Sequence, residues 1–244
     1  MQREVLMRRW HCAIILVVLM IAVAMTATAK IHLGEWKEVN SKDGIVGYTR
    51  MTSLTKVEEV KAVGVVEAPV AVIEAVLRDV EAEPQYMYKC AEARTVTLPG
   101  LTATNDISQV YNRTSMPWPV SDRYVVVKSE LMVDTKTGTL YVRARELTAD
   151  YSRAPSGAVR VPLVRYIMIV TPLGESKSQV HYQVLSDPGG SLPTSVVNLF
   201  SNSMGVDTIA GLRKMVEMKK YRNAKVLVTT TPWTGIDYTS QLDQ

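Results

Sequence analysis

The sequence contains few of the residues that most often build catalytic or metal sites. Its 244 residues include two cysteines, three histidines and one phenylalanine. These histidines and cysteines are too widely separated for a common zinc site, so we expect no metal. No Gly-x-Ser-x-Gly motif, phosphate-binding glycine-rich loop or dinucleotide fingerprint occurs, so we expect no cofactor. The absences predict a protein without catalytic residues. Catalysis by carboxylates stays open, because spacing along the sequence does not reveal pairs in space.

Neither sign of charge is in large excess. The formal net charge is +4, from 28 basic and 24 acidic residues. Three of the basic residues and one of the acidic residues lie within the first nine positions, which leaves +2 for the remainder. Proteins that bind nucleic acids carry clustered excesses of Lys and Arg. We therefore expect no nucleic-acid partner.

The first 29 residues have the features of a secretory signal peptide. Three arginines precede an uninterrupted apolar run, Ala13–Met25, and small residues follow it at Ala27–Ala29. The run is shorter than the roughly 20 residues of a membrane-spanning helix. We predict cleavage after residue 29, with an uncleaved N-terminal membrane anchor as the alternative. Because Cys12 lies in this segment, the mature chain keeps Cys90 alone, which favours export to a bacterial periplasm without disulfides.

The remainder is predicted to form one domain, residues 30–221, and a tail, residues 222–244. Alternating apolar and polar residues, separated by turn-forming Gly and Pro, indicate about nine strands connected mostly as hairpins. Two helices interrupt them, one early and one late. The pattern predicts an α+β domain in which a long amphipathic helix covers the open side of a curved antiparallel sheet.

The helices have recognisable ends in the sequence. The first begins at Pro69, where a missing N–H costs nothing, and Glu83-Pro84 is expected to end it. The second follows the turn Asp187–Pro193 and extends to about Lys220. Within a valine-rich strand, Gly64 is expected to form a bulge or a bend.

A proline-rich loop, Ser115–Arg123, interrupts the strands near the middle of the chain. Its prolines exclude helix and central strand and place Trp118 on a loop, where a large apolar ring usually covers another surface. In the following strand, Tyr124–Val133, alternate residues share one face: Val125, Val127, Ser129, Leu131 and Val133. An ordinary core strand explains this alternation as well as a pocket wall does.

The late helix carries a stripe of soft and small residues at helical spacing: Val197, Phe200, Met204, Thr208, Gly211, Leu212 and Met215. A tightly packed core would favour Leu and Ile at such positions, and Met adapts to irregular or variable shapes. The stripe therefore suits a binding surface. An ordinary packing face with small residues for close approach explains it equally well.

Three stretches together resemble the START family of lipid-binding domains, which is related to the steroidogenic acute regulatory protein: Val63–Val80, Met116–Arg123 and Ser186–Asn198. Their order and separation match the family pattern over about residues 34–220. The resemblance implies a helix-grip fold, in which a curved antiparallel sheet surrounds a long C-terminal helix and leaves a tunnel for one apolar molecule.

The resemblance also implies roles for the residues described above. Met116 and Trp118 would form a gate over the tunnel, and Asp122 and Arg123 would anchor the gate loop structurally. The expected ligand-binding residues line the sheet and the helix: Val110, Val125, Val127, Ser129, Leu131, Val197, Phe200, Met204, Thr208 and Leu212. Cholesterol-binding relatives carry a carboxylate and an arginine near the positions of Val110 and Ser129, so the sterol assignment is unsupported here.

The expected function is non-catalytic binding, and transfer, of a single lipid or other hydrophobic small molecule by a monomer that contacts a membrane surface transiently. The alternative is a helix-grip enzyme, a cyclase or hydrolase acting on an apolar or aromatic substrate. That alternative requires a titratable group in the tunnel, with Arg165, Glu146 and His181 as the residues to inspect. A third hypothesis is a protein-binding domain whose tunnel is filled by large side chains.

Overall fold

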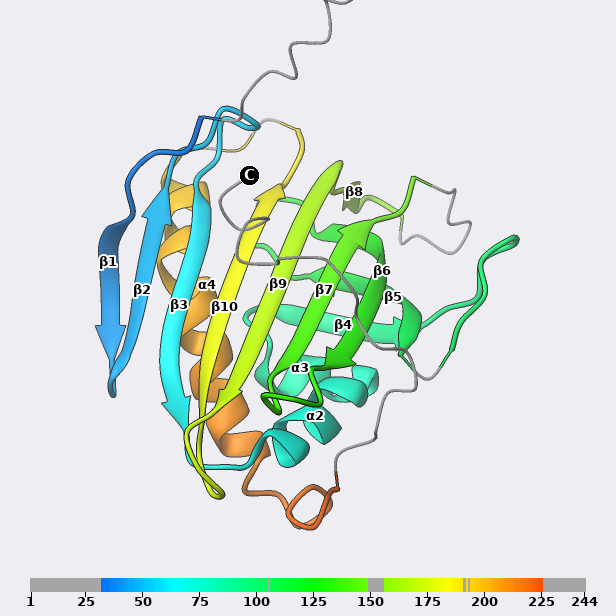
Figure 1. Cartoon of the computed structure of the whole chain (residues 1–244). Coiled ribbons are helices and arrows are strands. Elements are labelled where there is room, and N and C mark those ends of the chain that lie inside the picture. Colours follow the sequence, from blue (N-terminus) through cyan, green and yellow to red (C-terminus); the bar gives the residue numbers. More distant parts are fainter. Residues whose placement is uncertain (1–31, 105, 149–155, 191, 193, 226–244) are drawn as a thin grey trace, which may run out of the picture.

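The computed structural model describes residues 32–104, 106–148, 156–190, 192 and 194–225 (Figure 1). The signal peptide predicted for residues 1–29 and residues 226–244 of the predicted tail lie outside them. Within the described part, no helix is both long enough and apolar enough to cross a membrane.

Ten strands form a single sheet in the described part of the chain. They are β1 (Lys37–Lys42), β2 (Ile45–Arg50), β3 (Glu59–Val66), β4 (Cys90–Thr95), β5 (Ile107–Thr114), β6 (Arg123–Val133), β7 (Leu140–Glu146), β8 (Val159–Arg160), β9 (Leu163–Pro172) and β10 (Ser178–Asp187). Their order in space is β1-β2-β3-β10-β9-β7-β6-β5-β4, with antiparallel neighbours throughout. The two-residue β8 pairs in parallel with β6.

The long helix α4 (Thr194–Met215) packs across one face of the curved sheet, chiefly against β3 and β2 (Figure 1). Three shorter elements lie near its C-terminal end: α2 (Val70–Arg78), the 3-10 helix η1 (Val80–Ala82) and α3 (Glu83–Tyr86). The α+β helix-grip architecture predicted from the sequence is confirmed, with ten strands in place of about nine. The additional strand is the short β8, which has too few residues to show a strand pattern in the sequence.

Side-chain alternation along the strands gives the sheet an inner face, toward α4, and an outer face. On β10, Tyr182 and Val184 lie on the inner face, whereas His181 and Gln183 lie on the outer face. The sheet therefore presents two chemically different surfaces. The inner one carries most of the hydrophobic core.

Two glycines let α4 approach its neighbours closely. A Cβ atom added at Gly205 would lie 2.6 Å from the Cβ of Ala62 on β3, and one added at Gly211 would lie 2.4 Å from the backbone oxygen of Tyr86. Real Cβ atoms do not approach other heavy atoms so closely, because their van der Waals radii forbid it. The small residues on α4 thus include positions of direct backbone packing.

Three local predictions differ from the structure. Gly64 forms no bulge, because its strand keeps a regular register with β2 and β10, and its missing side chain makes room for Ile45. Pro84 does not end a helix: it lies in the first turn of α3, where its missing donor is harmless. The late helix ends at Met215, and turns follow it to about residue 223.

Candidate ligand-binding site

Two adjoining cavities lie between the inner face of the sheet and α4. The larger has a volume of about 160 Å³ and the smaller about 90 Å³. The residues common to both linings are Thr114, Val161, Val184, Ser186 and Met204. The sheet and the helix therefore do not meet directly along their whole length, and together the cavities extend from α3 to the proline-rich loop.

The larger cavity brings together residues from both regions that the sequence singled out. Val110 of β5, three residues of β6 and Met204 of α4 line it; the β6 residues are Val125, Val127 and Ser129. The smaller cavity is lined by Val197 and Phe200 of α4 and by Met116 of the proline-rich loop. One wall of the larger cavity is thus a valine-rich strand face. Burying the apolar surface of a ligand against this wall would be favourable.

Three residues expected to bind ligand lie outside both linings. Leu131 and Leu212 belong to the main hydrophobic core, where their exposed fractions are 6% and 0%. The Thr208 hydroxyl donates to the backbone oxygen of Met204 at 2.7 Å and accepts from the backbone N–H of Tyr88 at 3.2 Å. The bond from Tyr88 joins α4 to the segment after α3, and the two bonds together occupy the hydroxyl that the sequence suggested for a ligand.

The two residues of the proposed gate lie differently. Met116 lines the smaller cavity, but Trp118 lines neither and is 93% exposed. In this conformation the indole points away from the domain and covers no other surface of the described residues. Sequence reasoning placed this ring on a loop, but it could not determine the direction in which the ring points.

Asp122 and Arg123 hold the proline-rich loop in place. The Asp122 carboxylate accepts from Arg113 at 2.6 Å and from the backbone N–H of Met116 at 3.0 Å. The Arg123 guanidinium donates to the backbone oxygens of Pro188 at 2.9 Å and Gly189 at 3.2 Å, and also to that of Ser121. Arg123 therefore ties the strand after the loop to the turn that precedes α4.

Glu83, at the start of α3, is a cavity residue that sequence reasoning missed. Its carboxylate lines the larger cavity and accepts a 2.8 Å hydrogen bond from the side chain of Asn112 on β5. Burial raises the pKa of Glu83 to about 7, and the Asn112 hydrogen bond opposes part of this rise. The sequence offered only a weak signal, an acidic residue before a proline, because the two partners are 29 residues apart.

Tyrosine rings complete the polar part of the cavity lining. Tyr86, Tyr166 and Tyr182 all line the larger cavity, and the rings of Tyr166 and Tyr182 make an edge-to-face contact at 5.4 Å. Burial raises the pKa of each of these phenols, so all three stay protonated at neutral pH and can donate hydrogen bonds. The cavity thus offers valine walls together with donors, an amide and one carboxyl group.

The titratable residues named for the enzyme alternative do not line these cavities. His181 lies on the outer face, where its ring is 3.0 Å from the Gln183 side chain, and Arg165 lies in a depression on the same face. The Glu146 carboxylate accepts from the backbone N–H of Val164 at 2.8 Å. Among the described residues that line the two cavities, Glu83 is the buried group whose pKa suits proton exchange near neutral pH.

Comparison with known proteins gives a consistent result. The family model described as START domain matches residues 22–222. The uncharacterized protein PA1579 of Pseudomonas aeruginosa is 32% identical over 187 residues, which cover 76% of this chain and 88% of that protein. A crystal structure of a STAR-related lipid transfer protein fragment from Xanthomonas axonopodis aligns with a TM-score of 0.65 and 27% identity, covering 75% of this chain and 99% of the fragment. Human StAR-related lipid transfer protein 5 shares the fold, with a TM-score of 0.63 and 18% identity over 82% of this chain and 93% of the human one.

Proposed function

Because this chain belongs to the START domain family, we propose that it binds one lipid or other hydrophobic small molecule non-covalently in the cavities beneath α4. The observation that carries the proposal is the hollow between the valine-rich face of β6 and Met204 of α4. Burial of apolar ligand surface there would contribute about 25 cal/mol per Å². Support also comes from the bacterial STAR-related lipid transfer protein, which has the same fold at 27% identity.

The polar groups of the larger cavity suggest the chemistry of the ligand. A hydroxyl or amide group on the ligand could donate to the Glu83 carboxylate and accept from a tyrosine phenol, while its apolar part contacts the valines. An anionic group would be disfavoured, because it would lie in a buried site beside a second carboxyl. We therefore propose a neutral amphipathic ligand.

The size of the cavities implies that ligand entry requires movement. Volumes of about 160 and 90 Å³ are below the roughly 300–1,000 Å³ of typical small-molecule pockets. The proline-rich loop and the first half of α4 bound the smaller cavity, so displacement of Met116 and Phe200 would enlarge it. We propose that this movement occurs at a membrane surface, to which the exposed ring of Trp118 is suited.

We further propose that the chain acts as an exported monomer in a bacterial periplasm and transfers its ligand between membranes. The basic, apolar and small-residue regions of the first 29 residues support export. Transfer without covalent change requires no cofactor or metal.

The experiment is ligand recovery followed by ligand transfer. Protein purified from its own host is extracted with solvent and the extract analysed by mass spectrometry. The emptied protein is then mixed with vesicles that contain labelled lipid. We expect one ligand per chain and saturable uptake. Absence of any recovered ligand together with absence of uptake would reject the proposal.

A matched pair of variants locates the binding site. Val125→Phe introduces a phenyl ring into the lining of the larger cavity, whereas Lys128→Phe introduces the same ring on the outer face of the same strand. We expect Val125→Phe to weaken uptake at least tenfold and Lys128→Phe to leave it within twofold, with folding of both checked by circular dichroism. Equal effects would place the ligand elsewhere.

The enzyme alternative is tested in the same samples. It is favoured by one observation, the pKa of about 7 for Glu83, which suits general acid–base catalysis. Conversion of the recovered molecule by the emptied protein, abolished in Glu83→Gln, would replace the binding proposal with the enzyme. Recovery of the molecule with unchanged mass after prolonged incubation would support binding alone.

A further inference from the structure

The larger cavity beneath α4 has one polar end, formed by Glu83 and two tyrosines. Tyr86 follows Glu83 on the short helix α3, and Tyr166 comes from β9; all three line the cavity. Burial raises the pKa of both phenols, and the nearby Glu83 carboxyl raises each of them further. The three polar side chains therefore lie close together, although they come from two distant parts of the chain.

The hydrogen bonds of this cluster leave two donors and an acceptor for a ligand. Asn112 donates to the Oε2 atom of Glu83 at 2.8 Å, and the Oε1 atom has no partner among the described residues. The hydroxyls of Tyr86 and Tyr166 likewise bond to none of the described residues, although Tyr86 is only 5% exposed. Buried polar groups are normally hydrogen-bonded, so open ones on a cavity wall indicate where a ligand can bond.

No charged side chain of the described elements around Glu83 pairs with it. The Cys90 thiol of β4 is near it and stays neutral, because burial raises its pKa to about 12. The neighbouring cation on β5, Arg113, pairs with Asp122 at 2.6 Å, and Glu81 of η1 is exposed. From α4, an uncharged methionine lines the cavity. Protonation of Glu83 therefore depends on its burial, on the Asn112 amide and on what occupies the cavity.

Protonation of Glu83 changes what its open oxygen can bond. An ionised carboxylate only accepts hydrogen bonds, whereas a protonated carboxyl also donates. A ligand with an acceptor alone, such as a ketone, could bond to the protonated form but would leave the ionised form with the Asn112 amide as its one donor. A ligand that also carries a donor, such as a primary amide, could bond to either form. A buried polar group left unpaired costs enough to reject ligands that lack its partner.

We propose that Glu83, Tyr86 and Tyr166 form a proton-controlled selectivity site: ionised Glu83 excludes ligands whose polar end only accepts hydrogen bonds and admits amides and alcohols, which also donate. This inference rests on the proposed function, because it specifies the ligand of the same cavity. The ligand oxygen accepts from the phenols, and the ligand donor bonds to Glu83. Binding of a ligand without a donor is therefore coupled to proton uptake by Glu83.

The test compares two probes of nearly equal size: octanamide, and 2-nonanone, in which a methyl group replaces the amide nitrogen. Binding of each to the full chain is measured by calorimetry at pH 6 and pH 8. With a pKa of about 7, the protonated fraction of Glu83 falls about tenfold between these values. We expect 2-nonanone to bind about tenfold more weakly at pH 8 and octanamide to change by less than about threefold.

Glu83→Gln is the decisive variant, because its amide side chain does not titrate and always offers a donor. Its affinity for 2-nonanone should be the same at both pH values within about twofold. The control Glu81→Gln, at an exposed position of η1, should keep the tenfold change of the parent. A ketone affinity that does not fall between pH 6 and pH 8 in the parent, or that still falls in Glu83→Gln, would overturn the proposal.

A second pair of variants tests the phenols. Tyr166→Phe removes one hydroxyl from the selectivity site and keeps the ring, whereas Tyr48→Phe removes a hydroxyl from a residue of β2 that lines neither cavity. We expect Tyr166→Phe to weaken both probes about fivefold at either pH, since one hydrogen bond is lost, and Tyr48→Phe to leave them within twofold. Equal effects of the two variants would exclude Tyr166 from the site.

The outcomes separate this inference from the proposed function. Binding of both probes with the same pH profile would overturn the selectivity and leave the cavity as a ligand site. Binding of neither probe at either pH would count against the cavity itself and overturn the inference with it. Val125→Phe should weaken both probes at least tenfold, and unchanged binding in that variant would place the probes elsewhere and overturn the inference.

Discussion

The most consequential single residue in the inner site is Glu83, because its protonation changes within the physiological range. In the unfolded chain its pKa would be near the ordinary 4.5, whereas burial raises the folded value to about 7. The folded state therefore binds a proton more tightly than the unfolded state between these two values. The resulting stabilisation is fully present below about pH 4.5 and is lost as the pH rises to about 7.

Glu83→Gln removes this titration while keeping the shape of the side chain. The parent should lose stability between pH 4.5 and pH 8 through the titration of Glu83, and the variant should not. We therefore expect the difference in free energy of unfolding, variant minus parent, to rise by up to about 3 kcal/mol between these pH values, since one pKa unit corresponds to about 1.4 kcal/mol. Urea unfolding at both pH values measures the difference. Glu81→Gln, at an exposed position of η1, is the control and should follow the parent. Parallel pH profiles for Glu83→Gln and the parent would contradict the prediction.

At the scale of the elements, the domain depends on how closely α4 approaches its neighbours. Gly211 lies directly against the backbone of Tyr86, at the end of the segment that carries Glu83. Thr208, one turn earlier, bonds to Tyr88. This half of α4 is thus closely packed, and the cavities lie under its other half, around Met204 and Phe200.

Gly211→Ala tests this close packing. In an exposed helix the change would stabilise by up to about 1 kcal/mol, but here the added methyl group would lie 2.4 Å from a backbone oxygen. We expect a loss of roughly 1–3 kcal/mol, because backbone cannot move aside as a flexible side chain can. Lys214→Ala, at an exposed position of the same helix, should change stability by less than about 0.5 kcal/mol. Thermal unfolding compares the two, and a stabilised Gly211→Ala would show that α4 does not approach α3 as described.

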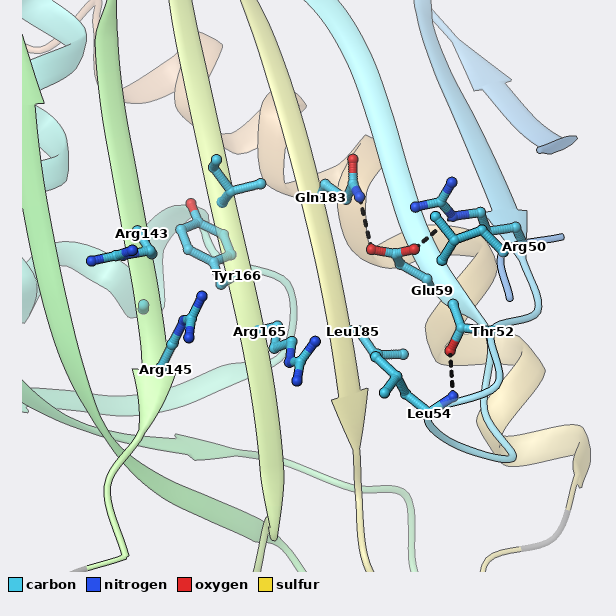
Figure 2. Close-up of a pocket in the computed structure, with 13 residues that line it drawn as sticks. Arg50, Thr52, Leu54, Glu59, Arg143, Arg145, Arg165, Tyr166, Gln183 and Leu185 are labelled. Atoms are coloured by element: carbon cyan, nitrogen blue, oxygen red, sulfur yellow. Dashed lines mark hydrogen bonds and ion pairs between the residues drawn. The ribbon is translucent and has the colours of Figure 1, made fainter. Parts of the chain in front are cut away.

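At the scale of the whole molecule, one sheet separates two surfaces of different chemistry. The larger inner cavity combines valine walls with the Glu83 carboxyl group, and Glu58 lines the smaller one, whereas the depression on the outer face is lined by four arginines, Glu59 and several apolar residues (Figure 2). The proline-rich loop lies apart from the outer depression and presents Trp118 to solvent. The loop that we propose to contact a membrane is therefore separate from this depression.

Trp118→Ala tests the role of the loop in membrane contact. We expect the affinity for a soluble ligand to stay within twofold, because Trp118 lines neither cavity, whereas transfer to vesicles slows by roughly tenfold with the loss of an interfacial aromatic ring. Leu173→Ala removes a half-exposed apolar side chain between β9 and β10 and should not affect transfer. Transfer rates from labelled vesicles measure both variants. Equal transfer by Trp118→Ala and the parent would exclude the indole from membrane contact.

The sequence by itself determined the strands, the long helix that covers them and the inner face of β6, because alternation and helical periodicity are local and follow from backbone geometry, and its resemblance to the START family indicated the helix-grip fold. Only the tertiary structure decided which members of those stripes border a cavity: Val127 and Met204 do, whereas Leu131 and Leu212 are closely packed. It also brought Glu83 to Asn112 and Arg145 to Arg165. A cavity is the space left where distant segments fail to fill the gap between them, so its position depends on all of them together and is not written in any one stretch of the chain.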